Sequence, residues 1–385
     1  MRTISKIKIF GISPYFIKLA TVFYCLLLCD ASSQIRFRLI IGGEERENYF
    51  KIDFLIFLKL KNFSKNEKDE RIMANKKILV VGSANMDLSM NMYKVPEVGE
   101  TIIDDGGVAY IPGGKGANAA VALTKLGSDC YFCAKVGADL HGQKLYQYYK
   151  ELGINTSYLK VDRENPTGLA VVMKESDGNN RIVVYPGANG NLTVDNINEA
   201  FECEPDALYL GFEIPFSVAL SAAKIAASRG IPIFVDAAPA GKDYPLESLP
   251  MMEVFSPNES ETETYTGILP QGTDSALRAA LALYKRVKAK YIVIKQGERG
   301  AFVYDGKHFF VIPSIRVGKA IDTTAAGDAF TSALTIEYLR SGGNIRNAVK
   351  FGVAAGAITV TRRGAATSVP TDDEVRALIL KEDLI

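Results

Sequence analysis

The sequence predicts an α/β fold, with a doubly wound, mostly parallel sheet, helices on both faces and a small β-sheet lid. Three observations lead to this prediction. Short, continuously apolar runs recur along the chain, as in strands that are buried on both faces. Segments of helical periodicity separate several of these runs, and strands that alternate with helices are typical of a parallel sheet. Two stretches of alternating polar and apolar residues depart from that rhythm and predict the smaller sheet.

The main sheet is predicted to begin with residues 76–82, an apolar run that ends in glycine. Its later strands are predicted at residues 207–210, 231–236, 252–255 and 291–295. Helices are predicted at residues 117–126, 216–229 and 273–287. One domain is sufficient for this part of the chain.

The smaller sheet is predicted from residues 88–110 and 167–185. Each stretch contains a turn sequence, Asp-Gly-Gly at 105–107 and Asp-Gly-Asn-Asn at 177–180. Both stretches should therefore form antiparallel strands, the second as a hairpin. Such a sheet could stand off the main one as a lid, or it could extend the main sheet at its edge. The pattern favours neither arrangement.

The first 72 residues differ in composition from the rest of the chain. They carry 13 Lys and Arg against 8 Asp and Glu, whereas the remaining 313 residues carry 32 against 36. We therefore expect a poorly ordered N-terminal extension of residues 1–72 and a domain of residues 73–385. Residues 19–29 are apolar, too few to span a bilayer, and have the shape of a signal-peptide core. We favour the alternative that translation starts at Met73, with a cytoplasmic domain.

The overall composition argues against several classes of function. A formal net charge of +1 does not suit a nucleic-acid binder with a broad basic face, and five cysteines in 385 residues do not form a disulfide framework. His141 and His308 are the two histidines, so acid–base chemistry should fall to carboxylates. Cys130 and Cys133 form a Cys-x-x-Cys pair without a recognisable second pair of ligands, and we interpret them as core residues rather than a metal site.

A glycine-rich segment, Gly-Gly-Lys-Gly-Ala-Asn at residues 113–118, runs directly into a predicted helix. Glycines there let a ligand approach the backbone closely at a helix N-terminus. The segment is not a Walker A loop, because Gly116 stands where Ser or Thr should follow the lysine. On its own, the segment could equally be a structural turn.

The stronger candidate is Asp-Thr-Thr-Ala-Ala-Gly-Asp at residues 322–328, followed by a helix predicted from 329 to about 339. The small residues 325–327 leave their amides unshielded at the helix N-terminus, which suits an oxyanion or a phosphate. Asp328 lies in the first helical turn, where the helix dipole stabilises its carboxylate. Such a carboxylate can accept the proton of an attacking hydroxyl, so we interpret Asp328 as a general base rather than only a helix-start residue.

These two segments resemble the two signatures of the PfkB-type carbohydrate kinases. The resemblance extends from about Lys76 to Pro370 and is greatest to those members that phosphorylate D-ribose. Residues 1–72 lie outside it. Five more segments support it in order along the chain: GSANMD (82–87), GFEIP (211–215), SPNESE (256–261), KQGERG (295–300) and TRRGAATSVP (361–370).

The resemblance implies an ATP-dependent kinase that converts D-ribose to D-ribose 5-phosphate. Asp328 would be the catalytic base on the primary hydroxyl of the sugar. The amides of Ala325, Ala326 and Gly327 would form the anion hole for the transferring phosphoryl group. The substrate-binding residues that the resemblance implies are Asn85, Asp87, Gly114, Lys115, Gly116, Asn118, Glu213 and Asp328.

The resemblance also implies a nucleotide site, Mg²⁺ and a monovalent cation, K⁺. Lys295 stands where ribose-phosphorylating members often have Thr, and Val353 stands where they can carry a His near the nucleotide. Glu261 would contact Mg²⁺ through water. The implied ATP-binding residues are Asn258, Lys295, Gln296, Gly297, Glu298, Arg299, Gly300 and Gly327. The implied K⁺ ligands are Asp322 through its carboxylate and Thr324, Thr359, Arg362, Gly364 and Ser368, mostly through backbone carbonyls.

Three alternatives remain open. Another kinase of the family, acting on fructose, a ketodeoxy sugar acid or a nucleoside, would carry the same catalytic elements. A nucleotide-binding oxidoreductase would share the strand–helix alternation, but the first strand is not followed by the GxGxxG fingerprint. A sugar-binding protein without catalytic activity would not need Asp328 and its anion hole. For the domain we expect a homodimer formed through the open face of the lid, and neither nucleic-acid nor membrane partners.

Overall fold

The computed structural model describes residues 37–41, 44–48, 75–175 and 180–382. The chain divides into two units, Met1–Arg71 and Ile72–Ile385, and each is described by itself. In the first unit, β1 (Phe37–Ile41) and β2 (Glu44–Asn48) pair antiparallel. The apolar run at residues 19–29 and the expected start at Met73 lie outside the described residues.

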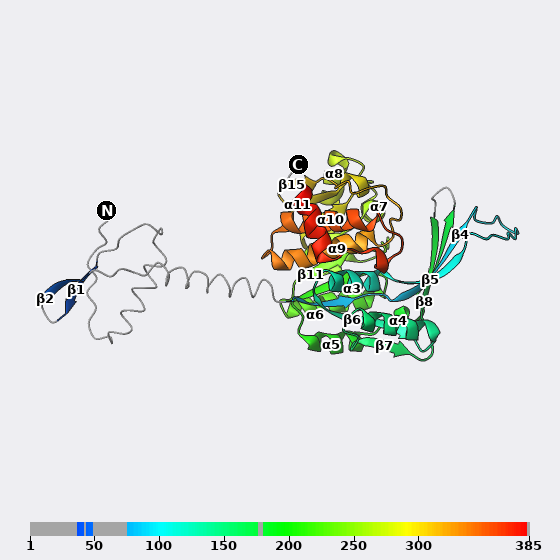
Figure 1. Cartoon of the computed structure of the whole chain (residues 1–385), viewed down its shortest axis with the longest axis horizontal. Coiled ribbons are helices and arrows are strands. Elements are labelled where there is room, and N and C mark those ends of the chain that lie inside the picture. Colours follow the sequence, from blue (N-terminus) through cyan, green and yellow to red (C-terminus); the bar gives the residue numbers. More distant parts are fainter. Residues whose placement is uncertain (1–36, 42–43, 49–74, 176–179, 383–385) are drawn as a thin grey trace. The chain divides into compact units, whose positions relative to one another are not determined.

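Figure 1 shows the second unit with its main sheet between helices. In the described part of this unit, the main sheet has nine strands in the order β15-β14-β13-β12-β11-β10-β3-β6-β7. All neighbours from β13 to β7 pair parallel, whereas β14 and β15 are antiparallel. The mostly parallel sheet and the five strands predicted from apolar runs are confirmed. The strands are β3 (Lys77–Val81), β6 (Asp129–Gly137), β7 (Leu159–Asp162), β10 (Ala207–Gly211), β11 (Ile233–Asp236), β12 (Met252–Ser256), β13 (Ala289–Lys295), β14 (Ala301–Tyr304) and β15 (Phe309–Ile312).

Helices cover both faces of this sheet, and alternate residues of a strand point into different cores. In β3, Leu79 and Val81 lie in one core and Ile78 and Val80 in the other. This is the doubly wound arrangement that was predicted. The first core contains α5 (Val194–Ala200), α6 (Phe216–Ser228), α7 (Glu259–Thr266) and α8 (Thr273–Arg286). The second contains α3 (Lys115–Lys125), α4 (Leu140–Glu151), α9 (Ala326–Arg340), α10 (Ile345–Thr359) and α11 (Asp372–Glu382).

Cys130 and Cys133 both lie in β6, and their free thiols are buried in opposite cores. Burial raises the pKa of each thiol to about 12, so both stay protonated at neutral pH. Thiols on opposite faces of a sheet cannot bind one metal ion together. The interpretation of this pair as core residues is confirmed.

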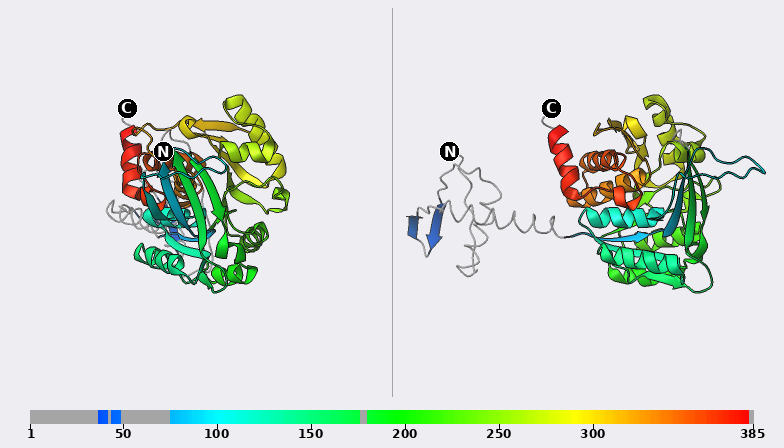
Figure 2. Two further views of the ribbon diagram at one scale, coloured as in Figure 1. Left: turned by 90° about the vertical axis from the view of Figure 1, so that its right-hand side faces the viewer. Right: turned by 45° about the vertical axis from the view of Figure 1, so that its right-hand side comes forward.

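The lid is a separate four-stranded sheet in the order β5-β4-β8-β9, and Figure 2 shows it at one side of the main layers. The alternative of an added edge on the main sheet is therefore wrong. The β8–β9 hairpin and the antiparallel β4–β5 pair are confirmed. β4 and β8, by contrast, pair parallel. The strands are β4 (Asn85–Met92), β5 (Val108–Gly113), β8 (Gly168–Glu175) and β9 (Asn180–Tyr185).

The strand order reverses between β3 and β10, the place where open α/β sheets form a crevice. From β3 the sheet continues through β6 and β7 on one side, and from β10 it continues through β11, β12 and β13 on the other. Ligands of open α/β sheets bind at the carboxyl ends of strands at such a reversal. Within the described residues, no helix is both long and apolar enough to cross a bilayer. Short 3-10 helices complete the fold: η1 (Gly187–Asn191), η2 (Phe201–Cys203), η3 (Leu246–Ser248), η4 (Gly297–Arg299) and η5 (Ala366–Ser368).

Candidate active site

The glycine-rich segment packs directly against the backbone that follows β3. A Cβ on Gly116 would lie 2.5 Å from the Ser83 nitrogen, and a Cβ on Gly113 would overlap the Asp87 carboxylate. Gly114 has a φ of 90° and precedes the first residue of α3. Backbone contact therefore requires glycine here, and the same contact brings the N-terminus of α3 to the crevice.

Glu213 joins this segment to the two central strands. It follows β10 by two residues, and its Oε2 accepts a hydrogen bond from the Ser83 hydroxyl. The same oxygen accepts from the Lys115 amide at 3.1 Å and from the Asn85 side-chain amide at 3.4 Å. Glu213, Asn85 and Lys115, all of which were expected to contact the substrate, therefore lie beside one another.

Asn189 is a site residue that the sequence did not reveal. It lies buried in η1, just after the lid hairpin, and its Oδ1 accepts from the Ala84 amide at 2.8 Å. Its Nδ2 donates to the Asn85 Oδ1 at 2.7 Å. Asn189 thereby sets the orientation of the Asn85 amide, and its only signal in the sequence is its place at the foot of the hairpin.

Two buried oxygens in the crevice have no hydrogen-bond partner among the described residues, Oδ1 of Asp87 and Oδ1 of Asn118. Burial, followed by the nearby Glu213 and Asp328 carboxylates, raises the pKa of Asp87 to about 7. Unpaired buried acceptors are costly unless a ligand supplies the donors. Hydroxyl groups of a polyol are suitable donors for both oxygens.

Asp328 lies buried in the first turn of α9 and faces the glycine-rich segment. Its Oδ2 accepts from the Asn118 Nδ2 at 2.8 Å, and its Oδ1 is 3.9 Å from the Lys115 Nζ. Burial raises the pKa of Asp328 to about 6, the Lys115 ammonium opposes that rise, and Asp236 adds to it. Asp328 is therefore ionised at neutral pH and basic enough to accept a proton.

The N-terminus of α9 has the form expected of an anion site. Ala325 precedes the helix with a φ of 61°, and no side chain caps the helix. A left-handed conformation at a non-glycine residue is strained and often occurs at functional sites. The Ala326 amide makes a long hydrogen bond of 3.3 Å to the Thr323 carbonyl. The first turn can therefore offer its amides to an anion.

A buried ion pair lies beneath this helix, formed by Asp236 at the end of β11 and Lys295 at the end of β13. The Lys295 Nζ donates to the Asp236 Oδ1 at 2.9 Å. The Asp236 Oδ2 accepts from the hydroxyls of Thr331 at 3.1 Å and Tyr209 at 3.3 Å. Asp236 was not among the predicted site residues, and its only signal was its place at the end of an apolar run.

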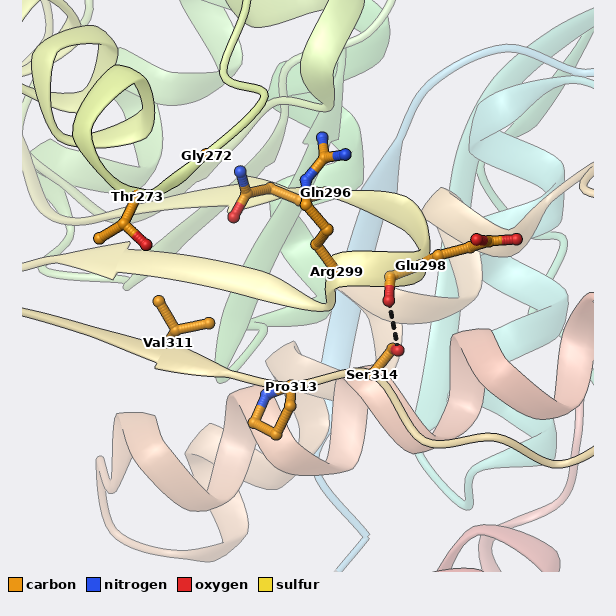
Figure 3. A pocket seen from close by; sticks show the side chains of 8 residues that line it. All are labelled: Gly272, Thr273, Gln296, Glu298, Arg299, Val311, Pro313 and Ser314. Carbon is orange, nitrogen blue, oxygen red and sulfur yellow. Dashed lines mark hydrogen bonds between the residues drawn. The ribbon is translucent and has the colours of Figure 1, made fainter.

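The loop expected beneath the nucleotide borders a cavity of about 350 Å³ (Figure 3). At one side of the cavity, the Ser314 hydroxyl donates to the Glu298 carbonyl at 2.5 Å. The cavity does not include Asp328 or the glycine-rich segment. Its lining residues are Gly272, Thr273, Gln296, Glu298, Arg299, Val311, Pro313 and Ser314.

The two residues expected near Mg²⁺ and phosphate cap a helix. The Glu261 Oε2 accepts from the Asn258 amide at 2.7 Å, and its Oε1 accepts from the Asn258 Nδ2 at 2.9 Å. Glu261 is buried near the Asp236–Lys295 pair. In the described ranges, no group of three or more His, Cys, Asp or Glu residues could hold a metal ion. This donor set suits Mg²⁺ only if substrate phosphates and water supply most of its ligands.

The segments expected to bind K⁺ lie side by side. The Ile321 amide donates to the Val360 carbonyl at 2.7 Å, and the Gly364 amide to the Asp322 Oδ2 at 3.4 Å. Asp322 also accepts from the Thr324 amide at 3.0 Å and from Lys174, on the lid, at 3.0 Å.

The side chains of the remaining expected ligands have other partners: Thr359 and Ser368 donate to the Ala355 and Ala365 carbonyls, and Arg362 pairs with Glu374. Backbone carbonyls are thus what these positions can offer. These carbonyls and the Asp322 carboxylate are oxygen donors, the type of ligand that hard cations take.

Comparisons with known proteins agree on one family. Residues 75–372 match the model of the pfkB family carbohydrate kinases. A ribokinase of Bacillus subtilis (strain 168) is 34% identical over 306 residues, covering 78% of this chain and 99% of the relative. A bifunctional ribokinase/ribose-5-phosphate isomerase A of Fructilactobacillus sanfranciscensis is 33% identical over 311 residues, covering 80% of this chain and 57% of the relative. The structure of Arabidopsis thaliana ribokinase complexed with ribose and ATP has a TM-score of 0.70 and 29% identity, covering 79% of this chain and 99% of that one.

The contact between Asn118 and Asp328 predicts a titration shift. A hydrogen bond to the carboxylate favours its ionised form, so Asn118→Ala should raise the pKa of Asp328 further above its wild-type value of about 6. Carboxyl ¹³C NMR against pH measures this, with the Asp328 signal identified by its loss in Asp328→Asn. The exposed Asn347→Ala should leave the titration unchanged. A fall in the pKa of Asp328 on replacing Asn118 would contradict the assigned contact.

Proposed function

This chain belongs to the pfkB family of carbohydrate kinases and is an ATP-dependent sugar kinase, and on that basis we propose that it phosphorylates D-ribose to D-ribose 5-phosphate. The observation that carries the proposal is the set of polar side chains around the crevice, with unpaired oxygens on Asp87 and Asn118. Relatives that are ribokinases, one of them in complex with ribose and ATP, support the choice of sugar.

In the proposed complex, Asp87 and Asn118 accept hydrogen bonds from sugar hydroxyls, and the Asn85 amide contributes a further polar contact. Carboxylate and amide groups suit a polyol, because each can bind neighbouring hydroxyls in a fixed geometry. Glu213 and Asn189 hold this arrangement in place through their contacts with Asn85. The sugar is thereby oriented with its primary hydroxyl toward Asp328.

Asp328 then takes the proton of that hydroxyl. At the same time the hydroxyl oxygen forms a bond to the γ-phosphorus of ATP, and the bond from this phosphorus to the leaving ADP oxygen breaks. The backbone amides of Ala325, Ala326 and Gly327 stabilise the negative charge on the transferring phosphoryl group. Phosphoryl transfer depends mainly on positioning and charge stabilisation, so a base and an anion hole supply what the protein must contribute. The lid would exclude water, which could otherwise accept the phosphoryl group.

The ions belong to this proposal as well. Mg²⁺, bound with the phosphates of ATP, would neutralise their charge, with Glu261 contacting it through water. K⁺ would be held by the Asp322 carboxylate and by backbone carbonyls of Thr324, Thr359, Arg362, Gly364 and Ser368. Residues 322–324 lead directly into α9. Binding of K⁺ to them would therefore also fix the backbone of the anion hole at the start of this helix.

The proposed reaction predicts the outcome of a substrate panel. With ATP and Mg²⁺, D-ribose should give the highest kcat/KM among ribose, 2-deoxyribose, fructose, a ketodeoxy sugar acid and adenosine.

Asp328→Asn should lower kcat by a factor of about 10³ or more while ribose still binds, because general-base catalysis and the local charge are lost but the sugar contacts remain. Coupled ADP release and calorimetry measure the two effects. A higher kcat/KM for another acceptor would contradict the assignment of ribose as the substrate. An active Asp328→Asn variant would refute the assignment of Asp328 as the base.

The proposed K⁺ site predicts activation by K⁺ over Na⁺ at equal ionic strength. K⁺ should also raise the melting temperature of the protein, whereas Asp322→Asn should remove both effects, because the charged ligand is lost. Differential scanning calorimetry supplies a measurement independent of catalysis. Equal rates and equal melting temperatures in the two salts would argue against the site.

We also propose a homodimer formed through the outer face of the lid. By the strand register, Tyr110, Leu88, Val171 and Val183 share the face opposite Asp87, and Tyr110 and Val183 are exposed. Contiguous exposed apolar surface of this kind marks an association site.

Val183→Glu should therefore shift the protein from dimer to monomer in light scattering. The matched change Val161→Glu, at another exposed valine, in β7, should not. A monomeric wild type would refute the dimer.

A further inference from the structure

The Asp236–Lys295 pair is unusual in its degree of burial. Asp236 is 2% exposed and Lys295 is 8% exposed. Bringing two charges out of water costs more than their attraction returns in most cases, so a neutral pair of similar volume would serve the fold at least as well. A charged pair at the carboxyl edge of a sheet therefore calls for an explanation in the site.

The position of the lysine ammonium supplies one. The Lys295 Nζ donates to Asp236 at 2.9 Å and makes only a long contact of 3.4 Å with the Thr331 hydroxyl. It also lies 3.5 Å from the point where a Cβ on Gly327 would stand. The ammonium therefore sits directly against an anion-hole residue, and no side chain at that residue separates them.

The surrounding charges indicate why this position matters. Besides Asp236, the buried carboxylates of Glu261 and Asp328 lie in the same field, and Lys115 is the other cation that acts on all three. An incoming phosphoryl group adds further negative charge to this cluster. A cation that is already held in place can stabilise that charge without reorganisation during the reaction.

We propose that Lys295 supplies a fixed positive charge beneath the anion hole, which stabilises the phosphoryl group during its transfer, and that Asp236 is the positioning residue that holds Lys295 there. The inference rests on the proposed kinase reaction and deepens it. Lys295 keeps its protons throughout, since the proton of the sugar hydroxyl goes to Asp328 while the oxygen–phosphorus bond forms and the bond to ADP breaks. Its contribution is electrostatic, and it belongs to the transition state more than to ATP binding.

Three variants separate this role from a structural one: Lys295→Met, Asp236→Asn, and the double variant Asp236→Asn/Lys295→Met. Lys295→Met should lower kcat about 100-fold, with less than about a fivefold change in the KM for ATP, as expected for a lost transition-state interaction. Asp236→Asn should lower kcat about 10-fold, because the ammonium loses its anchor. The double variant removes both charges of the pair, so it should recover melting temperature lost in Lys295→Met but keep kcat at least about 30-fold below wild type.

The double variant decides the matter. If its kcat returns to within threefold of wild type, Lys295 merely neutralises Asp236 and the inference is overturned. The matched control is Lys290→Met, on the same strand and also paired with a carboxylate, that of Glu253 at 3.3 Å, which should leave kcat unchanged. All assays use the best acceptor of the wild-type panel. A wild type that phosphorylates none of the acceptors would refute the proposed function instead, which is a distinguishable result.

Discussion

The candidate site depends on a balance of charge in a place with little water. Asp328 must be ionised to accept a proton, yet it is buried, and the nearby Asp236 carboxylate raises the pKa of both Asp328 and Glu261. Lys115 and Lys295 offset this repulsion from two sides, one from the glycine-rich segment and one from the central sheet. The other contacts of the crevice hold these carboxylates and ammonium groups at fixed positions relative to one another.

Backbone proximity is the second constraint, and it determines which residues can stand near the charges. The glycine-rich segment lies so close to the chain after β3 that a methyl group at residue 116 would meet the Ser83 backbone. That closeness brings the Lys115 amide and Asn118 to the same crevice as Glu213 and Asp328. Close packing of the backbone is therefore the first reason for glycine at residue 116. The same packing brings the polar groups of this segment within reach of a ligand.

Local patterns revealed most of the main sheet, because strands buried on both faces are apolar throughout, and the two signature segments revealed Asp328 and Asn118. The strands β7, β14 and β15 were missed, since each is only four residues long, and β7 and β15 also expose part of their side chains. Asp236, Asn189 and Lys174 were missed for another reason. Their partners lie 59, 104 and 148 residues away in the chain, so only the pairing of distant strands reveals their contacts.

The strand β4 carries two kinds of information on alternate residues. Asp87 points toward the crevice, while Leu88, its neighbour, belongs to the opposite, apolar face. A deletion or insertion of one residue in this strand would exchange the two faces, turning the carboxylate outward and an aliphatic side chain toward the sugar. Single substitutions in the lid leave this alternation of faces intact. Insertions or deletions between Asn85 and Met90, by contrast, are expected to be tolerated only when they change the strand by two residues.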